Sequence, residues 1–95
     1  MEAKTILESM PDALRHEVAV AALECNAARR RYDEGPRAGE PRCEFEHRAF
    51  SAYKGANRYL NGLIIGWLVA RGIPREAGLT VKRAAMDAAR AEFGV

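Results

Sequence analysis

The chain has 95 residues, the length of one domain, and it is 48% hydrophobic and 29% charged. This composition excludes an intrinsically disordered chain, and the net charge of +2 gives by itself no polyanion-binding signature. Alanine dominates the apolar residues whereas Val and Ile are few, so helix is favoured over sheet. We therefore expect residues 1–95 to form a single helical domain.

A short helix is predicted from about Glu2 to Met10, and a long helix from about Pro11 to Glu34. Ser9 can cap the long helix, and a proline suits its first turn. Gly35-Pro36 ends it, and a loop over residues 35–42 then joins two antiparallel helices. Apolar residues recur along this helix at alternating intervals of four and three, as in a helix that packs through one face: Leu14, Val18, Ala21, Cys25, Ala28 and Tyr32.

The third helix is predicted from about Cys43 to Arg71, where Gly72-Ile73-Pro74 stops it. Three glycines lie inside this helix, and each costs about 1 kcal/mol relative to Ala. Gly62 and Gly66 share one face, so we expect another helix to approach closely there; a kink near Gly62 is the alternative. The apolar stripe is expected to consist of Phe45, Ala49, Ala52, Ala56, Tyr59 and Leu63.

A last helix is predicted from Val81 to Phe93, with Thr80 as its N-cap and Gly94 after its end. Its small residues allow tight packing against the long helices. The expected fold is all-α: a small helical bundle built on a long antiparallel helix hairpin, packed by one or two shorter helices.

The longest apolar run, Gly62 to Ala70, is about half the length of a membrane span. The first residues contain no apolar signal segment. Cys25 and Cys43 do not make a disulfide framework, so we expect free thiols and a cytoplasmic protein.

No group of residues predicts catalysis or metal binding. Cys43 and His47 have helical spacing, but His16 and Cys25 point to opposite faces of one predicted helix and cannot complete a zinc site. No orienting third group accompanies Cys43, no carboxylate pair stands out, and the glycines form no phosphate-binding loop. We therefore expect no cofactor, no metal and no enzymatic activity.

Residues 74–84 resemble the turn of a helix-turn-helix, with a turn glycine followed by Thr80 and a basic helix. This resemblance implies a small DNA-binding transcriptional regulator as the alternative function. Asp87 opposes it, because a carboxylate on that helix would face the phosphates. The residues expected to contact nucleic acid are Lys82, Arg83 and Arg90.

Two features predict a protein partner. The run Arg29-Arg30-Arg31 suits an acidic surface, although cations at a helix C-terminus and pairs with Asp33 and Glu34 explain it better. Residues 63–69 are apolar on every side of the third helix, so they are either core or an interface. The candidate interface residues in this segment are Ile64, Ile65, Trp67 and Leu68.

These observations favour a non-catalytic protein-binding module, whose partner is another protein or a second copy in a homodimer. The Arg-, Ala- and Gly-rich composition indicates GC-rich coding. A phage- or mobile-element-encoded regulator or inhibitor that docks on a host bacterial protein complex, for example an anti-CRISPR-type inhibitor, would fit this size and composition.

Overall fold

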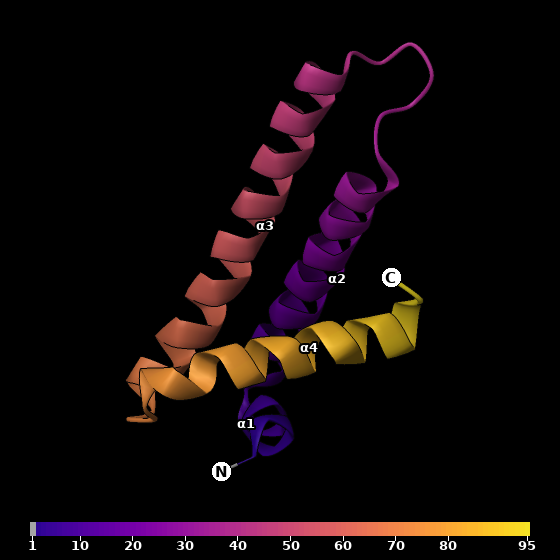
Figure 1. The fold of residues 1–95 in the computed structure, drawn as a ribbon. Coiled ribbons are helices and arrows are strands. Elements are labelled where there is room, and N and C mark those ends of the chain that lie inside the picture. Colours follow the sequence, from indigo (N-terminus) through magenta and orange to yellow (C-terminus); the bar gives the residue numbers. More distant parts are fainter. Residues whose placement is uncertain (1) are drawn as a thin grey trace.

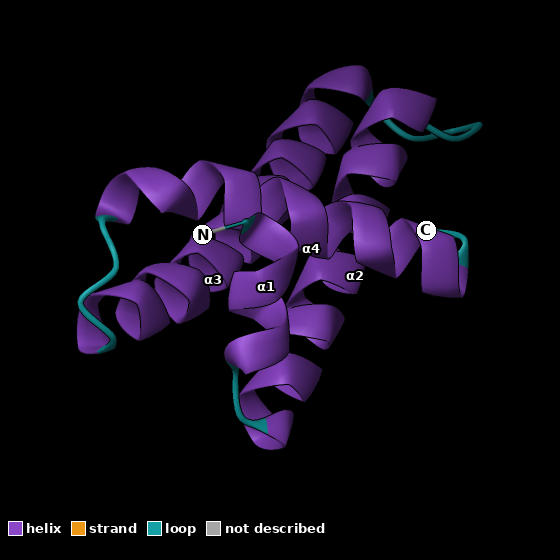
Figure 2. Ribbon diagram, turned by 90° about the horizontal axis from the view of Figure 1, so that it is seen from below, coloured by secondary structure: helices purple, strands orange, loops and turns teal. Residues whose placement is uncertain are grey.

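A computed structural model of the protein describes residues 2–95, and all of the regular structure in this part of the chain is helical (Figure 2). Helices α2 and α3 form a long antiparallel hairpin, α4 crosses its lower part, and α1 lies below α4 (Figure 1). This arrangement confirms the all-α bundle. The elements are α1 (Ala3–Ser9), α2 (Asp12–Glu34), α3 (Arg42–Ala70), the 3-10 helix η1 (Arg75–Ala77) and α4 (Gly78–Phe93).

The apolar core lies at the lower end of the hairpin, where all four α-helices contribute side chains to it. Ile6 of α1, Cys25 of α2 and Val81 of α4 meet there with the C-terminal half of α3. The upper part of the hairpin projects beyond α4, and the molecule is therefore elongated, with extents of 48 × 24 × 20 Å. No helix of residues 2–95 combines the length and the apolar character that crossing a membrane requires.

The buried face of α3 differs in part from the predicted stripe: Ala56 and Leu63 are half-buried against the core, whereas Ala52 and Tyr59 are exposed. Phe45 and Ala49 are buried as expected, but Tyr59 is 52% exposed. The buried line instead continues through Leu60, Ile64 and Leu68. Each step of four residues rotates this line by about 40° around a helix. The rotation suits α3 because its C-terminal half packs against α4 as well as α2.

The last helix begins at Gly78 rather than at Val81. Gly78 has right-handed helical angles (φ −57°, ψ −43°), so α4 follows η1 directly. Thr80 lies inside the first turn, where its hydroxyl donates to the carbonyl of Ala77 at 2.9 Å, and the predicted N-cap is wrong. Ser9 likewise does not cap α2, because its hydroxyl donates to the carbonyl of Ile6 at 2.6 Å.

Asn26 joins α2 to the C-terminal part of α4. It is the one polar side chain that is buried among the described residues. Its Nδ2 donates to the carbonyl oxygens of Met86 at 2.9 Å and Val95 at 3.0 Å. These two hydrogen bonds hold the end of α4 against the hairpin.

We expect Asn26→Ala to destabilise the protein by about 1–2 kcal/mol, because a net contribution near 1 kcal/mol is typical of each hydrogen bond. For a domain of this size, the melting temperature should then fall by roughly 5–10 °C. Thermal and urea unfolding followed by circular dichroism measure this change. A melting temperature within one degree of the wild type would show that the two bonds contribute nothing.

Candidate protein-binding surface

The apolar segment 63–69 is mostly core. Ile64 and Leu68 have no exposed surface, and Ile65 and Trp67 are half-buried against the same cluster. The expectation that Ile64 or Leu68 contacts a partner is therefore wrong, since α2 and α4 cover this end of α3 together. Of the larger apolar residues in the segment, Val69 is the one that points outward, with 58% of its surface exposed.

Ile65 and Trp67 also have neighbours within the chain. A Cβ on Gly78 would lie 2.7 Å from Cδ1 of Ile65, so α3 and α4 make their close glycine contact at this point. The guanidinium carbon of Arg71 lies 5.3 Å from the centre of the Trp67 ring. Both side chains thus complete the packing at the base of the hairpin rather than forming a separate patch.

A different surface lies on the side of α3 that faces away from α2, where Figure 1 shows no neighbouring helix. Helical geometry puts Tyr59 and Val69 opposite the buried line through Leu60 and Ile64, and both are exposed. A Cβ built on any of the three α3 glycines meets no atom of residues 2–95 within 4 Å. The predicted close approach of another helix of this chain to Gly62 and Gly66 is therefore wrong. We call this surface the outer face of α3; it consists of Gly55, Tyr59, Gly62, Gly66 and Val69.

The composition of the outer face is unusual for a helix face that is exposed to solvent. Exposed helix faces are normally charged or polar, yet these five residues carry no charge, and no Asp or Glu occurs between Glu46 and Glu76. Each exposed glycine also disfavours the helix by about 1 kcal/mol relative to Ala. Nothing within residues 2–95 compensates this destabilisation by packing against the glycines.

Sequence analysis missed Tyr59, Gly55 and Val69 as surface candidates because it placed Tyr59 in the buried stripe. The spacing of 55, 59, 62, 66 and 69 alternates four and three, which indicates one helical face. This spacing and the absence of carboxylates from residues 47–75 are the two features of the sequence that indicate the outer face.

The three consecutive arginines of α2 have different surroundings. Arg29 and Arg30 are exposed and form i,i+4 ion pairs with Asp33 and Glu34, each at 3.4 Å. Such exposed pairs contribute little to stability. The guanidinium carbon of Arg29 also lies 5.8 Å from the ring centre of Tyr53 on α3. Arg29 and Arg30 therefore remain accessible cations at the surface.

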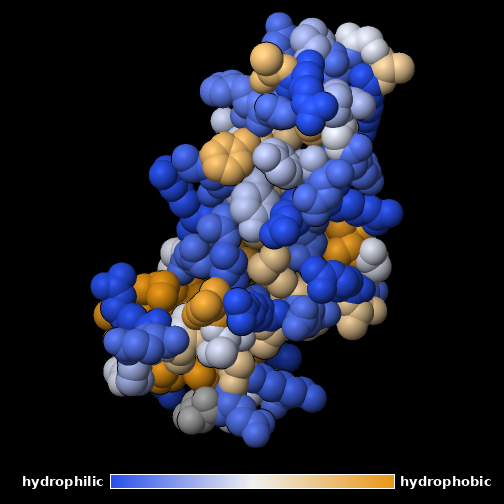
Figure 3. Space-filling view, in the orientation of Figure 1, coloured by the Kyte–Doolittle hydropathy of each residue, from blue (hydrophilic) through white to orange (hydrophobic). Residues whose placement is uncertain are grey.

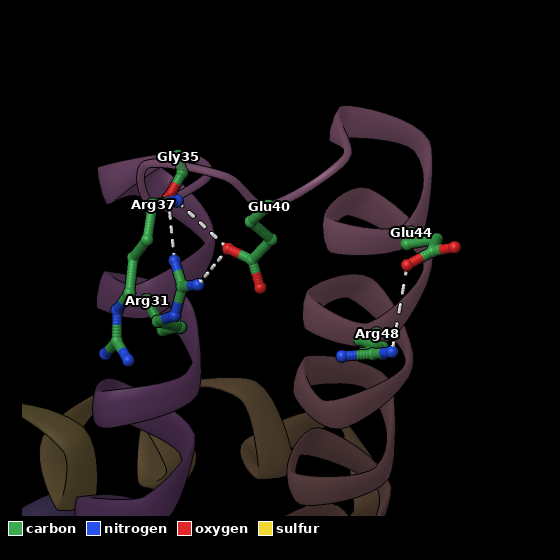
Figure 4. Close-up of polar contacts among 6 residues, drawn as sticks. All are labelled: Arg31, Gly35, Arg37, Glu40, Glu44 and Arg48. Atoms are coloured by element: carbon green, nitrogen blue, oxygen red, sulfur yellow. Dashed lines mark hydrogen bonds and ion pairs between the residues drawn. The ribbon is translucent and has the colours of Figure 1, made fainter.

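Arg31 instead holds the loop between α2 and α3 (Figure 4). Its NH1 donates to the carbonyl of Gly35 at 2.7 Å, and its NH2 donates to Oε1 of Glu40 at 2.6 Å. The same carboxylate oxygen accepts from the backbone N–H of Arg37 at 3.0 Å. The hydrogen bond from Arg37 and the one from Arg31 lower the pKa of Glu40. The fold thus gives Arg31 a structural role.

An open hollow lies between α2 and the C-terminal part of α4. Arg29 and Arg30 line this hollow together with Arg90. Arg90 was expected from the sequence to contact nucleic acid, whereas Arg29 and Arg30 were expected to contact a protein. Asp33 and Glu34 line it too, so its charge is partly balanced.

On the side of the molecule seen in Figure 3, hydrophilic residues predominate and hydrophobic ones form separate small groups.

The basic residues of α4 that were expected to contact nucleic acid have different surroundings. The predicted turn is absent, because α4 is continuous from Gly78 onward. Lys82 is half-buried and donates from Nζ to Oδ1 of Asn57 on α3. Arg90 lies 3.3 Å from Asp87, whereas Arg83 is exposed. Contacts within the chain therefore engage two of the three cations.

The thiols lie in different environments. Cys25 is buried and its pKa is raised by desolvation, which favours the unreactive thiol form. Cys43 is exposed near the start of α3. In the part of the chain that the structure describes, no three Cys, His, Asp or Glu side chains gather in a way that could hold a metal ion.

Comparisons of this chain with protein families, with curated proteins and with solved structures found no match.

Proposed function

We propose that this protein is a non-catalytic protein-binding module and that its contact surface is the outer face of α3. The observation that carries this proposal is the row of three α3 glycines, where a Cβ would meet no atom of residues 2–95 within 4 Å. Exposed Tyr59 and Val69 lie beside them. Glycines allow two helix backbones to approach closely, and tyrosine is among the residues that dominate interface energetics.

The fold supports this role because α3 is a long helix anchored at one end. Leu60, Ile64 and Leu68 fix its inner side in the core, so the outer face is presented on a rigid element. A rigid surface loses little conformational entropy when a partner binds. A regulator or inhibitor that docks on a host protein complex is the form of this function that we propose.

The test compares three full-length tagged chains: wild type, Gly62→Leu and the control Ala27→Leu. A side chain at position 62 enters open space, and Ala27 is an exposed residue of α2, so both variants should fold. We expect Gly62→Leu to reduce capture of the partner from nuclease-treated native extract at least tenfold. Ala27→Leu should retain it.

Salt dependence separates this function from nucleic-acid binding. Capture through an uncharged helix face should change little between about 50 and 200 mM salt, whereas binding to phosphates falls by orders of magnitude. Equal capture by all three chains would contradict the proposal. Capture that disappears after nuclease treatment or at the higher salt concentration would favour the DNA-binding alternative.

A further inference from the structure

We propose that a second surface of this protein, where α3 meets α4, binds single-stranded nucleic acid. We call this surface the basic corner; it consists of Phe50, Lys54, Arg58, Lys82 and Arg83. It includes no residue of the outer face of α3, so this activity is additional to the proposed protein binding. Its support comes from the distribution of charge along the chain, the contact between the two helices and an exposed aromatic ring.

The charges of the chain are distributed unevenly. Residues 47–83 contain seven lysines and arginines and one carboxylate, Glu76, whereas the rest of the chain contains eight and twelve. This segment therefore carries a charge of +6 and the remainder carries −4, although the net charge of the chain is only +2. Such an asymmetry favours a polyanionic ligand, because a ligand responds to the local charge of the surface that it meets.

The fold brings cations of two helices into one surface. Lys54 and Arg58 are exposed one turn apart on α3. Helix α4 begins beside the lower end of α3 (Figure 1), and Lys82 donates from Nζ to Oδ1 of Asn57, the residue before Arg58. This hydrogen bond uses one of three Nζ protons, so Lys82 keeps its charge and two donors. Arg83 follows it and is exposed.

The four cations of the basic corner form no ion pair with a carboxylate of residues 2–95. Asp87 lies one turn beyond Arg83, but its carboxylate pairs with Arg90 at 3.3 Å. Lysine and arginine bind phosphate through charge-assisted hydrogen bonds. The basic corner therefore offers several phosphate contacts that the chain itself leaves open.

An exposed aromatic ring among these cations indicates a single strand rather than a duplex. Phe50 is 52% exposed, and Nζ of Lys54 lies 5.3 Å from the centre of its ring. The ring of Tyr32 on α2 extends the aromatic surface, with 6.2 Å between the two ring centres. Unpaired bases stack on such rings beside a positively charged groove, whereas duplex bases stack on one another. An acidic polypeptide would pair with the cations but has no base to stack.

Fluorescence anisotropy of a labelled strand of about 20 thymidines measures this activity on the full chain. We expect a dissociation constant in the micromolar range at about 50 mM salt. It should rise roughly 20–50-fold at about 200 mM salt, because three or four phosphate contacts to a single strand give that dependence.

Two competitors test the chemistry of the ligand. Duplex DNA of the same length and polyglutamate of the same charge should each compete at least fivefold more weakly than the unlabelled strand. Equal competition by polyglutamate would show that an acidic protein segment suffices, and a preference for duplex would show that no base stacks on the protein. Either result, or no binding at submillimolar protein concentration, would overturn the proposal.

Removal of two cations tests the location of the phosphate contacts. Lys54→Gln combined with Arg58→Gln should raise the dissociation constant at least tenfold and reduce the slope of its salt dependence by about 1.4. Arg15→Gln combined with Arg37→Gln is the matched control, because it removes the same charge from exposed positions outside the basic corner. The control should stay within twofold of the wild type. An equal loss in both variants would mean that net charge alone drives binding, and the site would be wrong.

Removal of the ring tests base stacking separately. Phe50→Ala should raise the dissociation constant at least fivefold and leave the salt dependence unchanged, since stacking involves no counterion release. Phe93→Ala is the matched control, because this ring is 47% exposed at the end of α4. Both variants should keep the melting temperature within a few degrees. Wild-type affinity of Phe50→Ala, or an equal loss in Phe93→Ala, would contradict a single strand bound at the basic corner.

Discussion

Leu68→Glu should unfold the protein at 25 °C. Leu68 has no exposed surface and lies among core residues from α2 and α4. Truncating a buried leucine costs about 2–5 kcal/mol, and an unpaired buried carboxylate adds several more. A domain of this size is stable by roughly 5–10 kcal/mol in total. The loss is therefore comparable with the whole free energy of folding.

Val69→Glu is the matched control because it changes the next residue of the same helix. Val69 is 58% exposed, so the carboxylate remains in water and the melting temperature should change by only a few degrees. Far-ultraviolet circular dichroism of both variants measures the result. A folded Leu68→Glu protein would show that α3 is rotated relative to this structure. The same glutamate at position 69 should weaken association through the outer face.

Replacing Gly55, Gly62 and Gly66 together by alanine should stabilise the single chain. An added Cβ meets no atom within 4 Å at any of the three positions. Each replacement in an exposed helix interior contributes about 1 kcal/mol, so the sum is about 2–3 kcal/mol if the contributions add. The melting temperature should rise by roughly 10–20 °C.

The same three methyl groups should oppose association, because they keep two helix backbones apart. The expected result is therefore higher stability together with weaker capture of the partner protein, measured by urea unfolding and by capture from native extract on one preparation. A gain in stability together with a loss of binding would explain why this helix contains glycines that destabilise it. A lower melting temperature would contradict the open surroundings of these residues. Unchanged association would argue against the outer face as the contact surface.

Local sequence signals predicted most of the elements but not all of their boundaries. Gly35 and Gly94 have positive φ angles and follow α2 and α4 at the predicted positions. The start of α4 was misplaced because Gly78 resembles a turn residue, whereas its right-handed conformation continues the helix. A glycine permits both conformations, and its packing against Ile65 favours the helical one.

The sequence by itself determined the helical class and the hairpin, because these depend on helix propensity and on the residues that end each helix. It also determined the buried positions at the upper end of α3, because α3 has only one helix neighbour there. The tertiary structure decided which side of α3 becomes core below Ala49. There α4 adds a second neighbour, and the buried line rotates toward it through Leu60 and Leu68. That rotation leaves Tyr59 and the α3 glycines on the outside. A single helix pattern cannot specify this outcome, since burial depends on where the other helices pack.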